Sequence, residues 1–176
     1  MWLCLTVGAA QASAPLQSIP SLDLPRYMGR WYEIAKFPNR FQKKCVADTS
    51  AQYSLLPDGQ VRVLNQCRLA SGDMDQALGT ARRADSDSWS RFQVRFAPGW
   101  LSLIPMVWGD YWVVDIDEGY QLAAVSEPSR EYLWILSRQP RVDEARYSAL
   151  LQRLRAMGLD TDRLEITPHA SPKQGN

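Results

Sequence analysis

The stretch GRWYEIAKFPNRF, residues 29–41, opens the first regular element of the chain with two adjacent aromatic side chains directly after a glycine. The run that follows is mostly apolar until Pro38, and beyond it the sequence becomes basic. Because proline lacks a backbone N–H, it ends a strand pattern. We therefore expect a strand over residues 29–37 whose bulky start, Trp31 and Tyr32, has a structural task of its own.

Composition is that of an ordinary globular chain. Of the 176 residues, 45% are hydrophobic and 22% are charged, which suits one domain with a sizeable core. Lys and Arg number 20 against 19 Asp and Glu, so the net charge of +1 predicts no nucleic-acid partner. We expect the domain over residues 22–167 and a polar C-terminal tail over residues 168–176.

The first 14 residues predict a signal peptide. Residues 2–10 are apolar, and AQASA at residues 10–14 offers small side chains at the spacing that a signal peptidase accepts. No basic residue precedes the apolar run, and a true start further upstream would make Cys4 a lipid-anchor cysteine. Otherwise Cys4 is one more apolar residue of the leader. Either way we expect an exported protein.

Export favours a disulfide between Cys45 and Cys67 over two free thiols, although free cysteines are also often buried. Counting from the turn at residues 57–59 leaves the two out of register, so the bridge requires a bulge or a bend. The sole histidine, His169, lies in the polar tail away from any set of residues with ligand spacing. We therefore expect no metal site and no cofactor.

Alternation with a period of two dominates the body of the chain. Apolar and polar side chains alternate in residues 51–55 and 61–67, and PDG between them is a hairpin turn signal. RFQVRF at residues 91–96 repeats the pattern. With the run at residues 29–37, about eight such strands predict a sandwich or a closed barrel. The remaining strands are expected over residues 74–84, 111–116, 120–126 and 132–137.

One helix is expected after the strands. Apolar side chains recur at helical spacing over residues 142–157, and Gly158 stands where a C-terminal cap belongs. A helix with one apolar stripe docks on the outside of a sheet. The fold class is therefore all-β with one C-terminal α-helix.

Three motifs in order resemble the lipocalin family, most closely the bacterial lipocalins of the outer-membrane lipoprotein type. GRWYE at residues 29–33 resembles the signature of the first strand, DEGY at residues 117–120 the second motif, and the arginine of LWILSRQP the third. The resemblance implies an eight-stranded up-and-down antiparallel β-barrel. It also implies that Trp31 plugs the closed end and stacks on Arg138, a contact worth about 1 to 2 kcal/mol. The motif residues are Gly29, Trp31, Asp117, Tyr120 and Arg138.

Hairpin parity assigns the loops to two ends of the barrel. The turns at residues 57–59 and 117–120 share the closed end with Trp31, so residues 38–44 and 97–109 form the mouth. The first mouth loop carries cations that suit an anionic head group, although each alone also fits a solvated loop charge. The second is apolar, which suits contact with a membrane surface or packing over the barrel. The expected mouth residues are Arg40, Lys43, Lys44, Trp100 and Trp108.

Alternation and the lipocalin register together place a mostly apolar set of side chains inside the barrel. Such a lining suits an acyl chain, with a gain of about 25 cal/mol per Å² of buried apolar area. The deepest residues, near Trp31, are expected to fill the barrel instead of lining free space. The expected ligand-binding residues are Tyr53, Leu55, Val63, Asn65, Phe92, Val94, Phe96, Tyr111, Val113, Ala123, Val125 and Trp134, with Asn65 as a polar anchor.

These features predict a carrier and not an enzyme. The sequence has no nucleophile elbow, P-loop or dinucleotide motif, and Glu33 is expected in a hydrogen-bond network at the closed end, not paired with Asp115 as acid and base. The expected ligand is a fatty acid or a lysophospholipid, held for envelope lipid storage, transport or repair. We expect a monomer or homodimer in the periplasm or at the outer membrane. The alternatives are a haem or tetrapyrrole carrier ligated by Tyr53 or Tyr111, a lipocalin-fold enzyme, and a structural envelope protein without a cavity.

Overall fold

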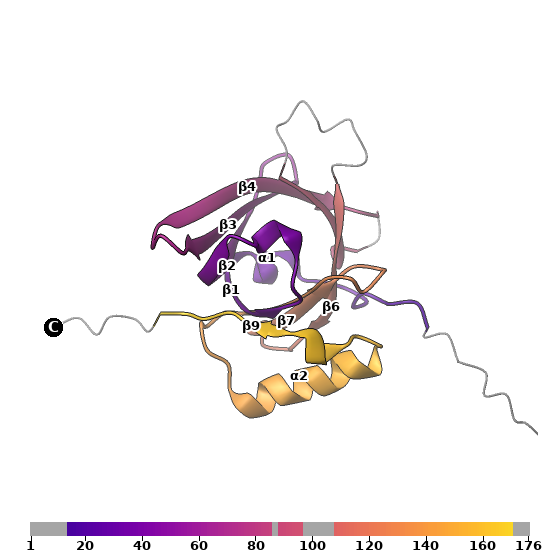
Figure 1. The fold of residues 1–176 in the computed structure, drawn as a ribbon. Coiled ribbons are helices and arrows are strands. Elements are labelled where there is room, and N and C mark those ends of the chain that lie inside the picture. The colour runs from indigo at the N-terminus through magenta and orange to yellow at the C-terminus, as the bar shows by residue number, and fades with distance from the viewer. Residues whose placement is uncertain (1–13, 86–87, 97–107, 171–176) are drawn as a thin grey trace, which may run out of the picture.

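The barrel is closed and antiparallel in the computed structural model, which describes residues 14–85, 88–96 and 108–170 (Figure 1). Hydrogen-bonded neighbours follow chain order from the second strand to the eighth, the eighth pairs with the first, and the first pairs with the second. The predicted fold class is confirmed. The barrel strands are β1 (Gly29–Lys36), β2 (Cys45–Leu55), β3 (Val61–Leu69), β4 (Met74–Arg83), β5 (Arg91–Arg95), β6 (Gly109–Ile116), β7 (Leu122–Ser126) and β8 (Leu133–Ser137).

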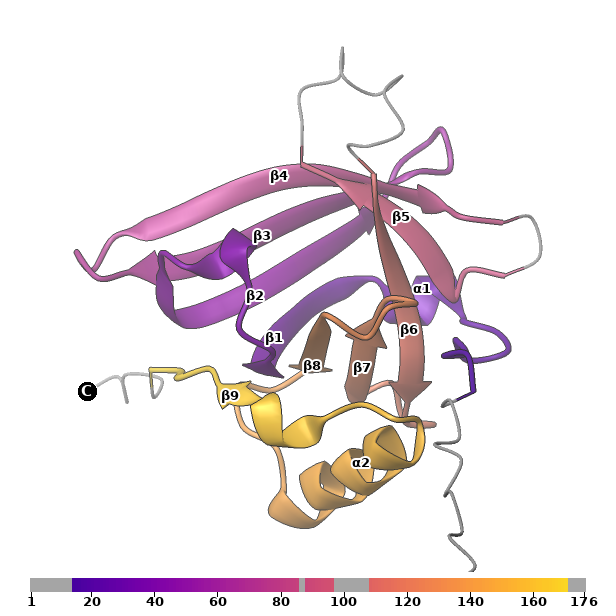
Figure 2. The same ribbon diagram turned by 45° about the vertical axis from the view of Figure 1, so that its right-hand side comes forward.

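The sheet buries a separate apolar cluster on each face. The inner cluster includes Trp31 and Phe92, and the outer one forms where helix α2 (Glu144–Ala156) covers the barrel through Leu150 and Leu154 (Figure 2). Gly158 has φ +80 and donates its N–H to the carbonyl of Arg155, so the predicted cap is confirmed. No helix among the described residues is long and apolar enough to cross a membrane.

Several strand boundaries differ from expectation, and two of the differences have clear local reasons. Strand β7 begins at Leu122 and not at residue 120, because Tyr120 takes φ +55 and the Asp117 carboxylate accepts the N–H groups of Gln121 and Leu122. Strand β2 begins earlier than expected, at Cys45, because its first half is irregular and hides the alternation.

The disulfide Cys45–Cys67 joins β2 to β3 with the two Cα atoms 5.5 Å apart. The register between these strands shifts on both sides of Ala47, and Asp48 lies in the left-handed region at φ +54. This bulge absorbs the mismatch in register, so both the bridge and the distortion that it requires are confirmed.

Four short elements have no strong sequence signal and were not predicted; two of them, the 3₁₀ helix η4 (Thr161–Arg163) and strand β9 (Glu165–Ile166), follow α2, and the other two flank β1. Helix α1 (Leu24–Tyr27) has Asp23 as its N-cap, with the side chain accepting the N–H of Arg26. Seen along the barrel in Figure 1, α1 lies across one end of it. The 3₁₀ helix η1 (Arg40–Gln42) forms in the loop between β1 and β2, where the Asn39 side chain caps it.

Residues 165–170, which we call the seam segment, complete the wall between β1 and β2. On this side, strand β1 pairs with β2 from Gly29 as far as Tyr32. Beyond that point it pairs with β9 (Glu165–Ile166). The N–H of Asp48 then bonds to the carbonyl of Pro168. The expectation that His169 lies outside any packed region was wrong, because its side chain is only 6% exposed and an imidazole nitrogen lies 2.6 Å from the carbonyl oxygen of Glu33.

Candidate functional site

The closed end is sealed by Trp31, which is fully buried. The guanidinium carbon of Arg138 lies 3.9 Å from the centre of its rings, and its indole N–H bonds to the carbonyl of Tyr27 at 2.8 Å. The expected stack is therefore present. Gly29 has φ +96, and a Cβ at this position would lie 3.3 Å from Arg138, which accounts for the glycine of the first motif.

Arg138 also holds the chain segments around the plug. Its guanidinium donates to the carbonyl oxygens of Arg26, Arg30 and Tyr120, from three separate segments. The Tyr120 ring in turn lies 4.0 Å beneath the guanidinium of Arg26. The motif residues are thus part of a structural closure of this end of the barrel.

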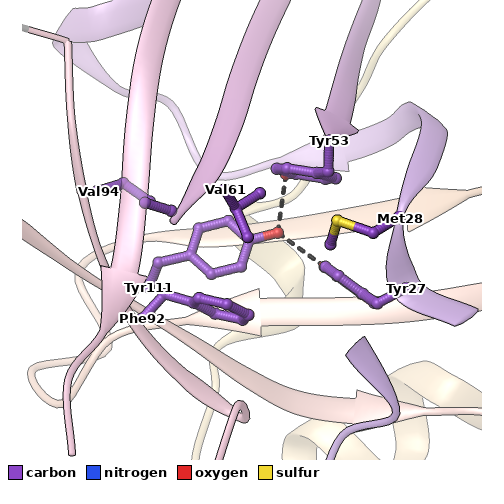
Figure 3. Close-up of a pocket in the computed structure, with 8 residues that line it drawn as sticks. Tyr27, Met28, Tyr53, Val61, Phe92, Val94 and Tyr111 are labelled. Carbon is purple, nitrogen blue, oxygen red and sulfur yellow. Dashed lines mark hydrogen bonds between the residues drawn. The ribbon is translucent and has the colours of Figure 1, made fainter. Parts of the chain in front are cut away.

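Three tyrosines lie above the plug, and we call their hydroxyl groups the tyrosine floor (Figure 3). The Tyr111 hydroxyl lies 2.7 Å from that of Tyr27 and 2.9 Å from that of Tyr53. Burial raises the pKa of Tyr53 to about 12 and the pKa values of Tyr27 and Tyr111 well above the ordinary one. All three are therefore neutral phenols that can donate hydrogen bonds at physiological pH.

The cavity at this floor is small, with a volume of about 10 Å³. That is room for about one water molecule. The residues around it belong to α1 and its cap, to β2 and to β3–β6, and they match the expectation that the deepest part of the barrel is filled. They are Tyr27, Met28, Tyr53, Val61, Ala81, Phe92, Val94 and Tyr111.

The expected lining residues differ in burial. The set of Tyr53, Val63, Phe92, Val113, Ala123 and Val125 is buried in the inner cluster, whereas Val94, Tyr111 and Trp134 pack against it and stay partly exposed. Asn65 is also partly exposed. The lining is therefore mostly buried and apolar, and Val94, Tyr111, Trp134 and Asn65 are its partly exposed members.

Leu55 and Phe96 depart from the buried positions expected of them. Leu55 is 51% exposed, because it is the last residue of β2 before the closed-end turn. Phe96 is 45% exposed and follows β5, yet the pairing of Ala81 with Val94 places it opposite Gly79 on the inner side. A Cβ on Gly79 would lie 2.6 Å from the Phe96 ring, so the ring packs directly against the backbone of Gly79.

Glu33 belongs to a network on the mouth side of the barrel, and the expected place at the closed end was wrong. Its carboxylate accepts hydrogen bonds from Gln42 of η1 and from Thr167 of the seam segment, both at 2.5 Å. Gln42 in turn accepts the indole N–H of Trp134 at 2.9 Å. Burial raises the pKa of Glu33. The carboxylate therefore links the mouth loop, the barrel wall and the C-terminal segment.

The expected mouth cations divide into two groups. Arg40 and Lys43 are exposed, and among the described residues neither makes an ion pair. Lys44 is also exposed, but its ammonium lies 2.7 Å from the Asp75 carboxylate. Arg40 lies against the Phe41 ring at 5.1 Å. Of the three expected mouth cations, Arg40 and Lys43 therefore carry a positive charge that no acidic side chain of the described structure neutralises.

The two expected mouth tryptophans have different outcomes. Trp100 lies outside the described residues. Trp108 packs under the guanidinium groups of Arg82 and Arg95, at 4.1 and 4.8 Å from its ring centre. Both arginines alternate along their strands with the inward-facing Ala81 and Val94. Trp108 therefore lies on the outer face of the barrel and not in its mouth.

No acid and base pair forms between Glu33 and Asp115. The Asp115 carboxylate accepts two hydrogen bonds from Arg153 of α2, at 2.7 and 2.8 Å, on the outside of the barrel. Within the described part of the chain, no group of three or more His, Cys, Asp or Glu side chains is placed to hold a metal ion.

Sequence reasoning missed Tyr27, Met28 and Gln42, and it also left Val61 and Ala81 out of the predicted lining. Tyr27 and Met28 come from α1 and its cap, and Gln42 from η1, helices too short to produce a periodic pattern. The signal that was present is local: Asp23 before Leu24 and a proline is a helix start, and a helix there places Tyr27 over the barrel end.

Comparison with known proteins gives a consistent family. The sequence model of the lipocalin-like domain matches residues 22–169. Temperature-induced lipocalin-1 of Arabidopsis thaliana is 43% identical over 164 residues, which cover 92% of this chain and 87% of that protein. The outer membrane lipoprotein Blc of Escherichia coli K12 is 32% identical, covering 90% and 87%. Apolipoprotein D of the mouse is 31% identical, covering 90% and 82%.

Solved structures agree with the fold. Insecticyanin of the tobacco hornworm Manduca sexta superimposes with a TM-score of 0.71 over 91% of this chain and 87% of that one, at 17% sequence identity. The cockroach allergen Per a 4 gives a TM-score of 0.66 at 22% identity, covering 88% and 92%. At these identities the likeness concerns the barrel and its helix alone.

Proposed function

Because this chain belongs to the lipocalin-like family, whose barrel binds small hydrophobic molecules, we propose that it is an exported carrier of fatty acids or lysophospholipids. In this proposal the barrel interior holds the acyl chain, and the protein serves envelope lipid storage, transport or repair. The observation that carries the proposal is an apolar barrel interior that is closed at one end by the Trp31 plug.

The interior favours a single long chain over a wide ring system. Its lining residues, among them Val63, Val94 and Trp134, are apolar or aromatic, and the cavity at its floor has room for about one water. An apolar chain entering from the mouth gains from burial along its length. Tyr53 and Tyr111, the tyrosines considered as haem ligands, are hydrogen-bonded to each other, and no observation favours the tetrapyrrole alternative.

The mouth supports an anionic head group on this ligand. Arg40 and Lys43 lie on the loop that also places Gln42 at the barrel rim. A carboxylate or phosphate near these two cations gains charge-assisted hydrogen bonds while it stays in contact with water. Lys44 contributes less in this proposal, since Asp75 already pairs with it.

Export and an envelope location rest on the leader-like first residues and on the name of one group of relatives. The Blc proteins of Escherichia coli, Citrobacter freundii and Vibrio cholerae are called outer membrane lipoproteins. The described chain begins to pack at Leu16, and the N–H of Ile19 bonds to the barrel at Val113. Residues 14–19 thus follow the predicted leader with an ordered connection to the domain.

The direct test is to identify what the protein carries. Native mass spectrometry of protein purified from its own host, followed by organic extraction, should reveal a bound fatty acid or lysophospholipid. A fluorescent fatty acid should then bind the delipidated protein saturably and be displaced by the extracted lipid. Absence of saturable binding by any single-chain lipid would contradict the carrier proposal.

Charge substitution tests the mouth separately. Arg40→Gln/Lys43→Gln should weaken fatty acid binding several-fold at low salt and reduce its salt dependence, while leaving a fatty alcohol unaffected. The matched control is Arg30→Gln/Arg62→Gln, which removes two exposed charges from the outer face near the closed end. Equal losses in the two double variants would mean that net charge matters and the mouth does not.

A further inference from the structure

A groove of about 380 Å³ lies on the outer face of the barrel, where β1, β2 and β3 run side by side. We call it the outer groove. The seam segment borders it through His169 and Ala170, and Pro140 borders it from the loop after β8. Helix α2 packs over the outer face of β6, β7 and β8 and leaves the groove uncovered (Figure 2). Small-molecule sites have volumes of about 300 to 1,000 Å³, so the outer groove is large enough to be one.

Four polar side chains in the outer groove have no partner within the described structure. Arg30 and Tyr32 alternate along β1 with the buried Trp31. Ser50 of β2 lies opposite Tyr32, and Gln66 of β3 lies opposite Ser50. In the described structure the side-chain nitrogen and oxygen atoms of Arg30, Tyr32, Ser50 and Gln66 make no hydrogen bond and no ion pair. Four neighbouring polar groups are therefore available to a bound molecule.

The polar atoms of these four side chains reach the surface of the groove. Arg30 is exposed. The oxygen and nitrogen atoms of Tyr32, Ser50 and Gln66 are not among the fully covered side-chain atoms of the described residues that lack a hydrogen bond. Part of the open surface of the groove is accordingly polar, and the larger part is apolar. A ligand in the groove can thus contact both kinds of surface.

The outer groove carries one positive charge that its own acidic side chain does not neutralise. Among the described residues that line it, Asp48 is the acidic one. Its carboxylate accepts hydrogen bonds from Arg68 Nε at 2.7 Å and from the N–H of Ala170 at 2.8 Å. Asp48 and Arg68 therefore neutralise each other, and the charge of Arg30 remains. A guanidinium beside hydroxyl and amide donors is complementary to a carboxylate or a phosphate.

The backbone spacing allows one anionic group to contact several of these donors. Residues two apart on a strand lie about 7 Å from each other on the same face, and paired residues of neighbouring strands lie closer. Arg30 and Tyr32 are two apart, and Tyr32 is paired with Ser50. An anion placed between their side chains can accept from the guanidinium and from both hydroxyls.

The apolar part of the groove favours a flat ring. The rings of Tyr32 and His169 meet edge to face, with their centres 5.6 Å apart. The Met74 thioether and the Pro140 ring line the same groove. Aromatic rings pack favourably against other rings and against sulfur. The groove therefore combines a set of donors for an anion with surfaces that suit an aromatic body.

We propose that the outer groove is a second ligand site, separate from the barrel interior, for a compact aromatic anion. The carboxylate or phosphate of this ligand binds Arg30, Tyr32 and Ser50, and its ring packs against Tyr32 and Met74. The site goes beyond the proposed carrier function and does not depend on it, because none of the side chains expected to line the barrel belongs to the groove. A ligand bound there also contacts the seam segment, so it connects β1 to the residues that complete the barrel wall.

The test compares 2-naphthoate and 2-naphthyl phosphate with the neutral 2-naphthamide, followed by their own fluorescence at low salt. The anions should bind saturably and more tightly than the amide. Arg30→Gln should weaken binding of the anions about tenfold, the effect of losing a hydrogen bond to a charged group, and should leave the amide almost unaffected. Tyr32→Phe, which keeps the ring, should also weaken binding of the anions alone.

The matched control is Arg62→Gln. Arg62 is an exposed arginine on the outer face of β3 that lies outside the groove, and its side chain makes no ion pair in the described structure. Its substitution should change the affinity of none of the three probes. Equal losses in Arg30→Gln and Arg62→Gln would show a response to net charge and would overturn the proposal. Equal affinity of the unmodified protein for the amide and the anions would overturn it as well.

Nuclear Overhauser effects locate the bound probe in the unmodified protein, so this measurement does not depend on a variant. Protons of 2-naphthoate should contact the Tyr32 ring and the Met74 methyl group. Contacts to Val63 and Val113, which belong to the inner cluster, would place the probe in the barrel and overturn the proposal. Absence of saturable binding by both anions would also overturn it. Binding of palmitic acid tests the carrier proposal alone, because the outer groove stands or falls with the naphthyl probes.

Discussion

Tyr111→Phe should destabilise the protein more than any other single tyrosine substitution at the floor. The Tyr111 hydroxyl is the centre of the chain of three, at 2.7 Å from one neighbour and 2.9 Å from the other. Its loss leaves the hydroxyls of Tyr27 and Tyr53 without partners, and both residues are buried. An unpaired buried hydroxyl costs about 1 to 3 kcal/mol, so the two together should lower the free energy of unfolding by about 2 to 6 kcal/mol.

Loss of an outer hydroxyl of the three should have a smaller effect than loss of the central one, and this contrast is the stronger part of the prediction. Tyr53→Phe removes one contact but leaves the Tyr27 and Tyr111 hydroxyls bonded to each other, so its cost should be about 0.5 to 1.5 kcal/mol. Replacing all three by phenylalanine removes every hydroxyl at once and leaves none unpaired. The triple variant should therefore be more stable than Tyr111→Phe alone, although it carries two further substitutions.

Urea unfolding of the delipidated protein with its disulfide intact, followed by tryptophan fluorescence and circular dichroism, measures these differences. Tyr147→Phe on α2 is the control, since Tyr147 is only partly buried and makes no hydrogen bond through its hydroxyl in the described structure. The reasoning is refuted if Tyr111→Phe costs no more than Tyr53→Phe, or if the triple variant loses the sum of the three single losses.

Three further predictions concern the plug, the disulfide and the mouth network. Trp31→Ala should lower the free energy of unfolding by about 3 to 5 kcal/mol, and Arg138→Ala should lower it by less. Because the two residues stack, the double variant should lose less than the sum of the two single losses in urea unfolding. Strict additivity would contradict the stack. Replacing Cys45 and Cys67 together by alanine should cost about 2 to 4 kcal/mol, while detection of two free thiols in the denatured, unreduced protein would exclude the bridge. Burial raises the pKa of Glu33, so the folded state keeps this proton to a higher pH than the unfolded chain does. The free energy of unfolding should thus fall as pH rises from the ordinary glutamate pKa through the raised one, and Glu33→Gln should flatten this slope; an identical slope in the variant would contradict the assignment.

The strands of the barrel could be predicted because one face of the sheet is buried and the other polar along much of their length. Residues 61–63 alternate, and β3 begins there with Val61 and Val63 inward. Where a strand is irregular the pattern disappears. The first half of β2 carries a bulge around Ala47, and sequence alternation located only its second half.

The parts of the site that escaped prediction depend on contacts between distant segments. Gln42 acquires its place from Glu33 and Trp134, and Trp134 is 92 positions away along the chain. His169 is held by the backbone of Glu33, 136 positions away. A polar side chain in a loop carries no local mark of such a partner. Leu55 was predicted to be buried for a different reason. Alternation predicts the face of the strand on which a side chain lies, but it does not show that Leu55 is at the exposed end of β2.

The seam segment has a consequence for the order in which the molecule can be assembled. One stretch of the barrel wall, beside the second half of β1, is supplied by residues 165–170, which are made last among the described parts of the chain. A chain that is synthesised or translocated from its N-terminus can pair β1 to β8 beforehand, but Glu33 acquires its hydrogen bond from Thr167 only after nearly the whole chain has emerged. Until then the wall has a gap beside the mouth, so closure of the barrel on this side is acquired only after residues 165–170 are available.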